Sequence, residues 1–291
     1  MEPALWLQDG PKSQHPLYHE PTLNGGRNGP QMRKLGLLGL VGLLVMAAPA
    51  GAITNGQPDG GRHPAVGALV GYYPPAGRSI AYCSGTLISS TVFLTAAHCG
   101  FLGPAVEVTF EETYTPASAT HTGTFHAHPG FRPGTNAQGQ NSFDIAVVVL
   151  DAPVSGITPA RLPSAGLLDQ MKAAGTLTQQ TQFTSVGYGD TQFVNGPGGH
   201  TTTHPQARHY SVGAFNSLTT AFLHLSQNSG NGGTCNGDSG GPNFLGAGSS
   251  ETSIIAGITV TGDTYCKATN VTYRLDTRGA RDFLGRYVHL P

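Results

Sequence analysis

Three polar residues in this sequence are of types that together could carry out nucleophilic catalysis. His98 follows an apolar run, Asp144 leads directly into the apolar run 145–150, and Ser239 lies among glycines in the segment 237–242. A serine hydroxyl is a weak nucleophile unless a neighbouring base takes its proton, and an imidazole base needs a carboxylate that fixes its tautomer. Taken singly, each residue has an ordinary structural explanation: a packed core histidine, an aspartate at the start of a strand, and a glycine–serine turn.

The elements that must position these residues are predicted to be short β-strands. The chain has 42 glycines and 21 prolines, and short apolar runs recur between turn residues. This pattern is typical of an all-β sandwich or barrel. A single helix is expected over 280–288, after an N-cap at Asp276 or Thr277, and the polar segment 191–209 is expected to be an exposed loop. We expect strands at 65–73, 80–88, 92–97, 106–110, 143–150, 183–187, 254–260 and 271–275.

Charge and cysteine content limit the class of protein. The chain has 15 Lys+Arg and 16 Asp+Glu, a net charge of −1, which argues against a nucleic-acid partner. Its four cysteines allow three disulfide pairings. We prefer the pairing of sequence neighbours, Cys83 with Cys99 and Cys235 with Cys266. There is no Cys-x-x-Cys pair, the histidines at 121, 126 and 128 fit a solvated loop better than a metal site, and neither a metal nor another cofactor is expected.

The first 52 residues are predicted to be a leader outside the fold. Residues 35–46 form an apolar run after two basic residues, which is too short to cross a membrane but typical of a secretory signal peptide. Small residues follow, so a signal peptidase could cut after Ala50 or Ala52. We expect 1–31 to be a leader extension or a mis-assigned start and 32–52 a signal peptide. Residues 53–291 would then be one extracellular domain, with no stable membrane insertion once the signal is removed.

Taken together, the motifs resemble those of the chymotrypsin/trypsin family of serine proteases, in its secreted, bacterial form. The order His98, Asp144, Ser239 and the spacings of 46 and 95 residues are similar to those of the family. The segments that carry the resemblance are Ile-Thr-Asn-Gly (53–56), Cys-Ser-Gly-Thr (83–86), Thr-Ala-Ala-His-Cys (95–99), Val-Gly-Tyr-Gly-Asp (186–190) and Gly-Asp-Ser-Gly-Gly-Pro (237–242). The first of these is similar to the mature N-terminus of the family, and the fourth to the segment between its two barrels.

The resemblance implies an all-β fold of two six-stranded antiparallel β-barrels with a C-terminal helix. It also implies a serine endopeptidase that works through an acyl-enzyme. Ser239 would be the nucleophile, His98 the general base and then the general acid, and Asp144 the residue that orients the imidazole. The backbone N–H groups of Gly237 and Ser239 would form the oxyanion hole. The substrate would be a protein or peptide, and we expect the enzyme to be a monomer.

The resemblance also assigns an activation step. Members of the family free an N-terminal Ile or Val whose ammonium pairs with the acid before the nucleophile, and these residues would be Ile53 and Asp238 here. A cut after Ala52 would expose Ile53 directly. Of the two preferred disulfides, the first would fix the histidine loop and the second would join the nucleophile loop to the wall of the specificity pocket.

The specificity pocket departs from the family pattern. Gly233 stands where trypsin has the acid that selects Arg or Lys, so an uncharged side chain before the cleaved bond is expected. Asn270 stands where glycine is common and would shorten the pocket. Either Thr259 or Thr261 would supply the hydroxyl that normally supports the catalytic aspartate.

Two other functions are alternatives. One is a catalytically inactive binding protein on a protease fold, which labelling of Ser239 by a fluorophosphonate would exclude. The other is an α/β hydrolase, because Gly-x-Ser-x-Gly (237–241) also matches the nucleophile elbow of that fold. Asp276 and His289 follow in the order that such a triad needs, but the sequence has no alternating strand–helix pattern.

Overall fold

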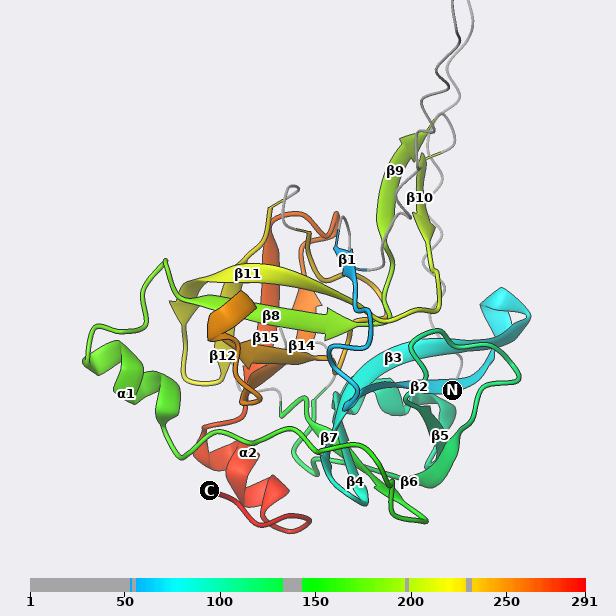
Figure 1. The fold of residues 1–291 in the computed structure, drawn as a ribbon, viewed down its shortest axis with the longest axis horizontal. Helices are drawn as coiled ribbons and strands as arrows, with labels where there is room; N and C mark the ends of the chain where they lie inside the picture. The colour runs from blue at the N-terminus through cyan, green and yellow to red at the C-terminus, as the bar shows by residue number, and fades with distance from the viewer. Residues whose placement is uncertain (1–52, 54–55, 133–142, 197–198, 229–231) are drawn as a thin grey trace, which may run out of the picture. The chain divides into compact units, whose positions relative to one another are not determined.

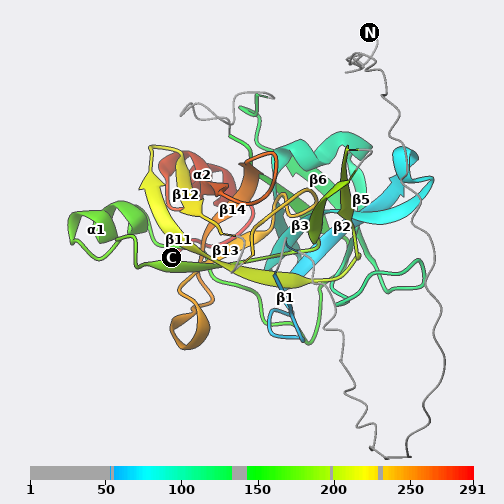
Figure 2. The same ribbon diagram turned by 90° about the horizontal axis from the view of Figure 1, so that it is seen from above.

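Two closed antiparallel β-barrels make up the fold, and both views place them beside each other (Figures 1 and 2). In this computed structural model the described residues are 53, 56–132, 143–196, 199–228 and 232–291. They all belong to one unit, 48–291, and the predicted leader at 1–52 lies outside them. No helix among the described residues has the length and apolar character needed to cross a bilayer.

The first barrel is built from the earlier part of the described chain. Its strands pair in the order β2–β3–β4–β7–β6–β5, and β5 pairs back to β2. Large and β-branched apolar residues such as Val66, Leu69, Leu94 and Val148 are fully buried in it, and these residue types favour the pleated backbone. The strands are β2 (Val66–Tyr73), β3 (Arg78–Ser89), β4 (Val92–Thr95), β5 (Ala105–Thr109), β6 (His121–Ala127) and β7 (Ala146–Leu150).

The second barrel closes in the same way. Its strands pair in the order β8–β11–β12–β15–β14–β13, and β13 pairs back to β8. The short strand β1 (Gln57–Pro58) adds to the edge of β11, which attaches the start of the domain to this barrel. The barrel strands are β8 (Gln182–Gly187), β11 (His209–Leu218), β12 (Phe222–Ser226), β13 (Pro242–Leu245), β14 (Ile255–Gly262) and β15 (Thr269–Arg274).

The helices differ in part from the expectation of a single closing helix. The C-terminal helix is present as α2 (Arg278–Leu284), and Thr277 caps it by accepting from the N–H of Ala280. A further short helix, α1 (Leu167–Ala173), was not expected. It begins without a side-chain cap of its own, but the N–H of Leu168 donates to Asp276 across a long sequence separation (2.8 Å). Because that partner is distant in the sequence, no local capping signal marks the start of α1.

The segment 191–209 is a hairpin with a buried end, and the expectation of an exposed loop was wrong. Strands β9 (Gln192–Gly196) and β10 (Gly199–Thr203) pair antiparallel, although their polar sequence lacks the apolar alternation of a half-buried strand. Beyond the hairpin, Gln206, Arg208 and His209 are buried. Oε1 of Gln206, the guanidinium of Arg208 and the ring of His209 each have a hydrogen-bond partner there, and the polarity of the sequence alone does not predict this burial.

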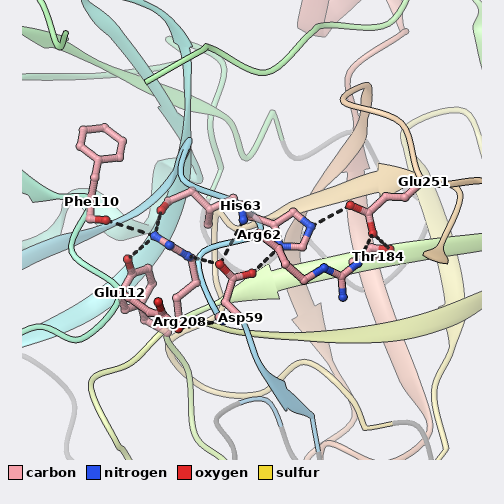
Figure 3. Close-up of polar contacts among 11 residues, drawn as sticks. Asp59, Arg62, His63, Phe110, Glu112, Thr184, Arg208 and Glu251 are labelled. Carbon is pink, nitrogen blue, oxygen red and sulfur yellow. Dashed lines mark hydrogen bonds and ion pairs between the residues drawn. The ribbon is translucent and has the colours of Figure 1, made fainter. Parts of the chain in front are cut away.

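A buried ionic cluster fixes the segment that follows Ile53 (Figure 3). Asp59 is 1% exposed, and its carboxylate accepts from Nε of Arg208 (2.8 Å) and bonds with the backbone N–H and the ring of His63. Arg208 immediately precedes β11 of the second barrel and also donates to the carbonyl of Val66 in the first barrel (2.9 Å). The cluster therefore joins the start of the domain to both barrels.

His63 bridges two carboxylates and is held as an imidazolium. Figure 3 shows its ring between Asp59 and Glu251. Its Nδ1 bonds with Asp59, and its Nε2 lies 2.8 Å from Oε1 of Glu251. Burial alone would lower the pKa of His63, but the hydrogen bonds to both acids outweigh it and raise the pKa. Burial alone would raise the pKa of Asp59, but its bonds with His63 and Arg208 lower it to about 2. The stability from His63 is thus present at acidic pH and is lost as pH rises through the raised folded pKa.

Replacing His63 with glutamine should lower the free energy of unfolding by about 3 kcal/mol, because buried carboxylates lose their cationic partner. The loss of stability that the wild type shows as pH rises through the His63 pKa should also disappear. Urea unfolding at several pH values between about 6 and 9 measures both effects.

Asp282→Asn is the control for His63→Gln. It breaks the exposed pair of Arg278 with Asp282 (3.4 Å) and should cost less than about 1 kcal/mol. If His63→Gln is as stable as this control and keeps the pH slope of the wild type, the assigned role of His63 is wrong.

Candidate active site

The pairing of β4 with β7 brings His98 and Asp144 together. Thr95 lies opposite Ala146, His98 follows β4 in the 3₁₀ turn Ala97–Leu102, and Asp144 shortly precedes β7. Asp144 is fully buried; its Oδ1 accepts the backbone N–H of His98 (3.0 Å), and its Oδ2 lies 2.8 Å from Nδ1 of the ring. This double contact fixes the ring and places the proton on Nδ1, so that Nε2 is the nitrogen left free to act as a base.

Two disulfides hold the loops that carry the site. Cys83 of β3 is bonded to Cys99 beside His98, and Cys235 before the nucleophile segment is bonded to Cys266. This is the pairing of sequence neighbours that was preferred above. Within the described residues, Cys83, Cys99 and His98 lie close enough together for a metal site. Both sulfurs are used in the disulfide, however, so they offer no thiolate ligand.

The segment around Ser239 turns tightly and needs its glycines. Gly237 has φ +93° and Gly240 has φ +81°, conformations that residues with a Cβ rarely adopt. A Cβ on Gly237 would also lie 2.9 Å from Cα of Gly189. The turn is closed by the N–H of Gly241, which donates to the carbonyl of Asp238 (2.9 Å). The backbone conformation on both sides of Ser239 therefore requires glycine at positions 237 and 240.

Ser84, at the centre of β3, connects the first barrel to the nucleophile segment. Its backbone N–H donates to the carbonyl of Ser239 (2.8 Å), and its hydroxyl donates to the carbonyl of Gly237 (2.8 Å). The same hydroxyl accepts the N–H of Tyr188 (2.9 Å), and the carbonyl of Ser84 accepts the hydroxyl of Thr95 (2.8 Å). One fully buried residue thus bonds to three separate segments of the site.

Two backbone N–H groups next to the nucleophile are free to bind an oxygen. Those of Gly237 and Ser239 donate to no group in the described part of the chain, whereas the N–H groups of Asp238, Gly240 and Gly241 all have carbonyl acceptors. Since unpaired backbone donors are rare inside proteins, a neighbouring pair of them indicates a place for an anionic oxygen.

A cavity of about 550 Å³ opens onto these groups. His98, Gly237 and Ser239 line it, and its other walls include Tyr82 and Phe101. Between Oγ of Ser239 and Nε2 of His98, no hydrogen bond forms within the described residues. In substrate-free enzymes this bond is often long and tightens only when the substrate is bound. The cavity places all the groups needed for attack on a carbonyl around one space.

Comparison with known proteins identifies the family. The family model described as Trypsin matches residues 72–280. The chain belongs to the trypsin family. It is therefore a serine-type hydrolase that acts on peptide substrates. A solved structure titled HL collagenase at 1.7 Å resolution is similar in fold, with a TM-score of 0.62 and 20% sequence identity over 80% of this chain and 97% of that chain. No curated protein matches the chain.

Asp238, which precedes Ser239, is buried, and no salt bridge joins it to a cationic group within the described residues. Its Oδ1 accepts the N–H of Gly189 and its Oδ2 that of Cys235, both at 2.8 Å. Burial raises the pKa of Asp238 to about 7, although the two backbone bonds oppose this effect. The side chain of Ile53 is fully buried, but no bond joins it to Asp238 within the described residues. Their expected pairing stays a prediction for a processed chain.

The residues of the predicted specificity pocket have partners that the sequence did not suggest. A Cβ on Gly233 would lie 2.8 Å from Oε1 of Gln227, so the buried amide of Gln227 closes the space beside this glycine. Asn270 is fully buried and donates to Oδ1 of Asn243 (2.8 Å). The hydroxyl of Thr259 accepts from Nδ2 of Asn243 (3.1 Å), and within the described residues it donates no hydrogen bond to Asp144.

The expected support of the catalytic aspartate by Thr259 or Thr261 is therefore corrected. The partners of the Asp144 carboxylate within the described residues are the two groups of His98. The pairing of β14 with β15 is irregular between Thr259 and Thr261. Such an irregularity changes which side chains face inward, so the sequence could not show which threonine lies near Asp144.

The histidines expected in a solvated loop lie on and directly after β6. His121 packs against Phe110, His126 against Tyr287, and His128 against Phe143 and Phe283. Each therefore packs on an aromatic ring, and the expected loop is a strand. The stacking of His128 on Phe143 (ring centroids 4.4 Å apart) holds the residue next to Asp144.

Ser84→Ala should weaken both stability and turnover. The change leaves the carbonyl of Gly237 and the N–H of Tyr188 without their buried partner, which should cost about 1–3 kcal/mol of unfolding free energy. Turnover of a peptide substrate should fall because the nucleophile segment loses one of its anchors.

Thermal unfolding and peptide hydrolysis measure these two effects of Ser84→Ala. Ser250→Ala serves as the control, since its hydroxyl bonds only within an exposed turn. Equal unfolding free energies and rates in both variants would refute the role given to Ser84.

Proposed function

We propose that this trypsin-family hydrolase is a secreted endopeptidase that cleaves peptide bonds with His98, Asp144 and Ser239 as its triad. The observation that carries the proposal is the double contact of Asp144 with the backbone and the ring of His98, on the wall of the cavity that also contains Ser239. Secretion is supported by the signal-like segment 35–46 and by two disulfides, which persist in oxidising compartments.

The proposed reaction follows from the positions of these groups. Oγ of Ser239 attacks the carbonyl carbon of the scissile bond while Nε2 of His98 takes its proton. The carbonyl oxygen becomes an oxyanion, to which the free N–H groups of Gly237 and Ser239 donate; one such donor contributes about 2.7–4 kcal/mol to catalysis. His98 then gives the proton to the leaving amine, and an ester of Ser239 remains. Water, activated by His98, hydrolyses this acyl-enzyme and restores the hydroxyl.

The proposed substrate has an uncharged side chain before the cleaved bond. Gly233 brings no acid to the pocket, and the adjacent Gln227 is an uncharged amide. A buried Lys or Arg would therefore lack a carboxylate partner, and an unpaired buried charge is costly. We also propose that the enzyme works as a monomer, because every residue assigned to the triad comes from one chain.

Variants of the triad test the proposal directly. Ser239→Ala should lower kcat on a peptide substrate by about 10⁶-fold. Asp144→Asn should lower it by about 10⁴-fold, because the amide favours the wrong imidazole tautomer. Steady-state hydrolysis of a peptide mixture, read by mass spectrometry, measures both effects.

The exposed residue Gln180 provides a control for the triad variants, since its amide bonds only to Thr178 and Gln180→Ala should match the wild type. Hydrolysis that survives Ser239→Ala would refute the triad. A correctly processed wild type that cleaves no peptide in the mixture would support the alternative of an inactive binding protein.

We propose that cleavage after Ala52 activates the enzyme by freeing the ammonium of Ile53. Two observations support this step: the Asp238 carboxylate is buried with hydrogen bonds from backbone N–H groups and no salt bridge among the described residues, and the side chain of Ile53 is already buried. An ammonium next to Asp238 would favour its ionised form and lower its pKa from about 7. The ion pair would then hold the segment that carries Gly237 and Ser239.

A protein that begins at Ile53 should be more active than one that keeps Gly51 and Ala52 in front of it. Losing the partner of a buried carboxylate costs about 3 kcal/mol, which corresponds to a reduction in kcat of roughly 100-fold. Asp238→Asn in the shorter protein should abolish the difference.

Active enzyme isolated from the medium identifies the natural cut. We expect its N-terminal sequence to start at Ile53 and its fluorescence to lack tryptophan emission, because the only tryptophan is Trp6. A different N-terminus, or equal kcat for the two proteins, would contradict the activation step.

A further inference from the structure

His204 is held at both ring nitrogens on the wall of the active-site cavity. It follows β10 directly, its Nδ1 lies 2.8 Å from Oδ1 of Asp190, and its Nε2 lies 2.7 Å from the carbonyl oxygen of Ala81 in β3. A carboxylate and a carbonyl can only accept hydrogen bonds, so each ring nitrogen has to carry a proton. The geometry therefore requires the imidazolium form of His204.

The backbone of Asp190 orients the peptide that contains the N–H of Gly237. The N–H of Asp190 donates to the carbonyl of Asn236 (2.8 Å), and the peptide between Asn236 and Gly237 is trans. In a trans peptide the carbonyl oxygen and the N–H point in opposite directions. The bond from Asp190 thus turns the N–H of Gly237 away from Asp190, to the side where no group of the described chain accepts it.

The ring of His204 also rests on this same peptide segment. A Cβ placed on Gly237 would lie 2.8 Å from Cε1 of His204, so the ring packs against the glycine backbone. His204, Asp190, Asn236 and Gly237 all line the cavity that contains Ser239. His204 therefore connects the first barrel, through Ala81, with the expected oxyanion hole.

We propose that His204 is a positioning residue for peptide hydrolysis: its imidazolium links Ala81 to Asp190 and so fixes the direction of the Gly237 N–H. This inference rests on the proposed function, because a fixed N–H matters only if an oxyanion forms there. When the ring loses a proton, one of its two nitrogens has no hydrogen left to donate. That nitrogen can no longer form a hydrogen bond with the acceptor it faces. The link to Ala81 or Asp190 then breaks, and the N–H of Gly237 is held less firmly, by the bonds from Asp190 and Ser84 alone.

The charges around His204 set the pH range of this effect. Asp190 contacts the ring and Asp238 acts on it electrostatically, while Arg78 and His98 line the same cavity. Burial alone would lower the pKa of His204, but its bonds to Asp190 and Ala81 and the charges of the two acids raise it. The imidazolium is present below the raised pKa, so kcat should fall as pH rises through it.

His204→Gln tests the proposal by its separate effects on kcat, KM and inhibitor affinity. The variant should lower kcat about 10- to 100-fold, which is less than the loss of a complete oxyanion donor network, and should leave KM unchanged. Its affinity for a peptidyl boronic acid, which places an oxygen in the oxyanion hole, should fall by the same factor. Its affinity for the product peptide should not change. The decline of kcat that follows the pKa of His204 should disappear, and a decline that follows the Ile53 ammonium should remain.

Asp190→Asn is the conservative variant of the link. Its amide can donate to Nδ1 of a neutral ring while Nε2–H still donates to Ala81, so no imidazolium is needed. This variant should keep more activity than His204→Gln and also lose the decline that follows the pKa of His204. His121→Gln is the matched control, since this histidine packs on Phe110 and should leave all four readouts unchanged.

The possible outcomes separate this inference from the proposed function. Wild-type kcat and boronic acid affinity in His204→Gln would overturn the inference, while an inactive Ser239→Ala would still support the triad. Hydrolysis that survives Ser239→Ala would overturn both. If His204→Gln does not fold, ¹⁵N NMR of the wild-type histidine rings decides: protons on both nitrogens of His204 at neutral pH support the proposal, and an unprotonated nitrogen overturns it.

Discussion

The active site depends on the hydrogen bonds that Ser84 makes between the two barrels. The proposed triad is divided: His98 and Asp144 belong to the first barrel, and Ser239 lies on a segment that leads into β13 of the second. Through its N–H, hydroxyl and carbonyl, Ser84 bonds to Ser239, Gly237, Tyr188 and Thr95. Ser84 thereby joins the segment of Ser239 to β4, the strand that precedes His98. Catalytic geometry must be held within fractions of an ångström, and fully buried contacts of this kind can hold it.

Several buried charged side chains in the structure form hydrogen bonds with groups that stabilise their charge. His63 and His204 each face acceptors at both ring nitrogens and are therefore cationic, one securing the start of the domain and the other the wall of the cavity. Asp238 differs, because its hydrogen bonds within the described residues come from backbone N–H groups and burial raises its pKa to about 7. A nearby cation would stabilise the ionised form of a buried carboxyl group whose pKa is raised in this way. The proposed ammonium of Ile53 would supply one.

The sequence predicted the parts of the structure that depend on local pattern and motif. Apolar runs predicted the strands around His98 and Asp144, and apolar spacing predicted a helix over 280–288, where the structure has Arg278–Leu284. Helix α1 was missed because its start is bonded to the distant Asp276, and the hairpin β9–β10 was missed because its polar sequence lacks the apolar alternation of a strand. The roles of Ser84 and His204 were missed for the same reason, since each depends on contacts across more than 100 residues of chain. The partners of Thr259 depend on a register irregularity that no residue type marks.

The central claim is that the two barrels bring His98, Asp144 and Ser239 together as one nucleophilic site. Reaction of the protein starting at Ile53 with a fluorophosphonate, followed by tandem mass spectrometry of its peptides, tests this most directly. We expect a single adduct on Ser239, formed much more slowly when His98 is changed to alanine. An adduct on another serine, or an unchanged rate of labelling without His98, would contradict the account.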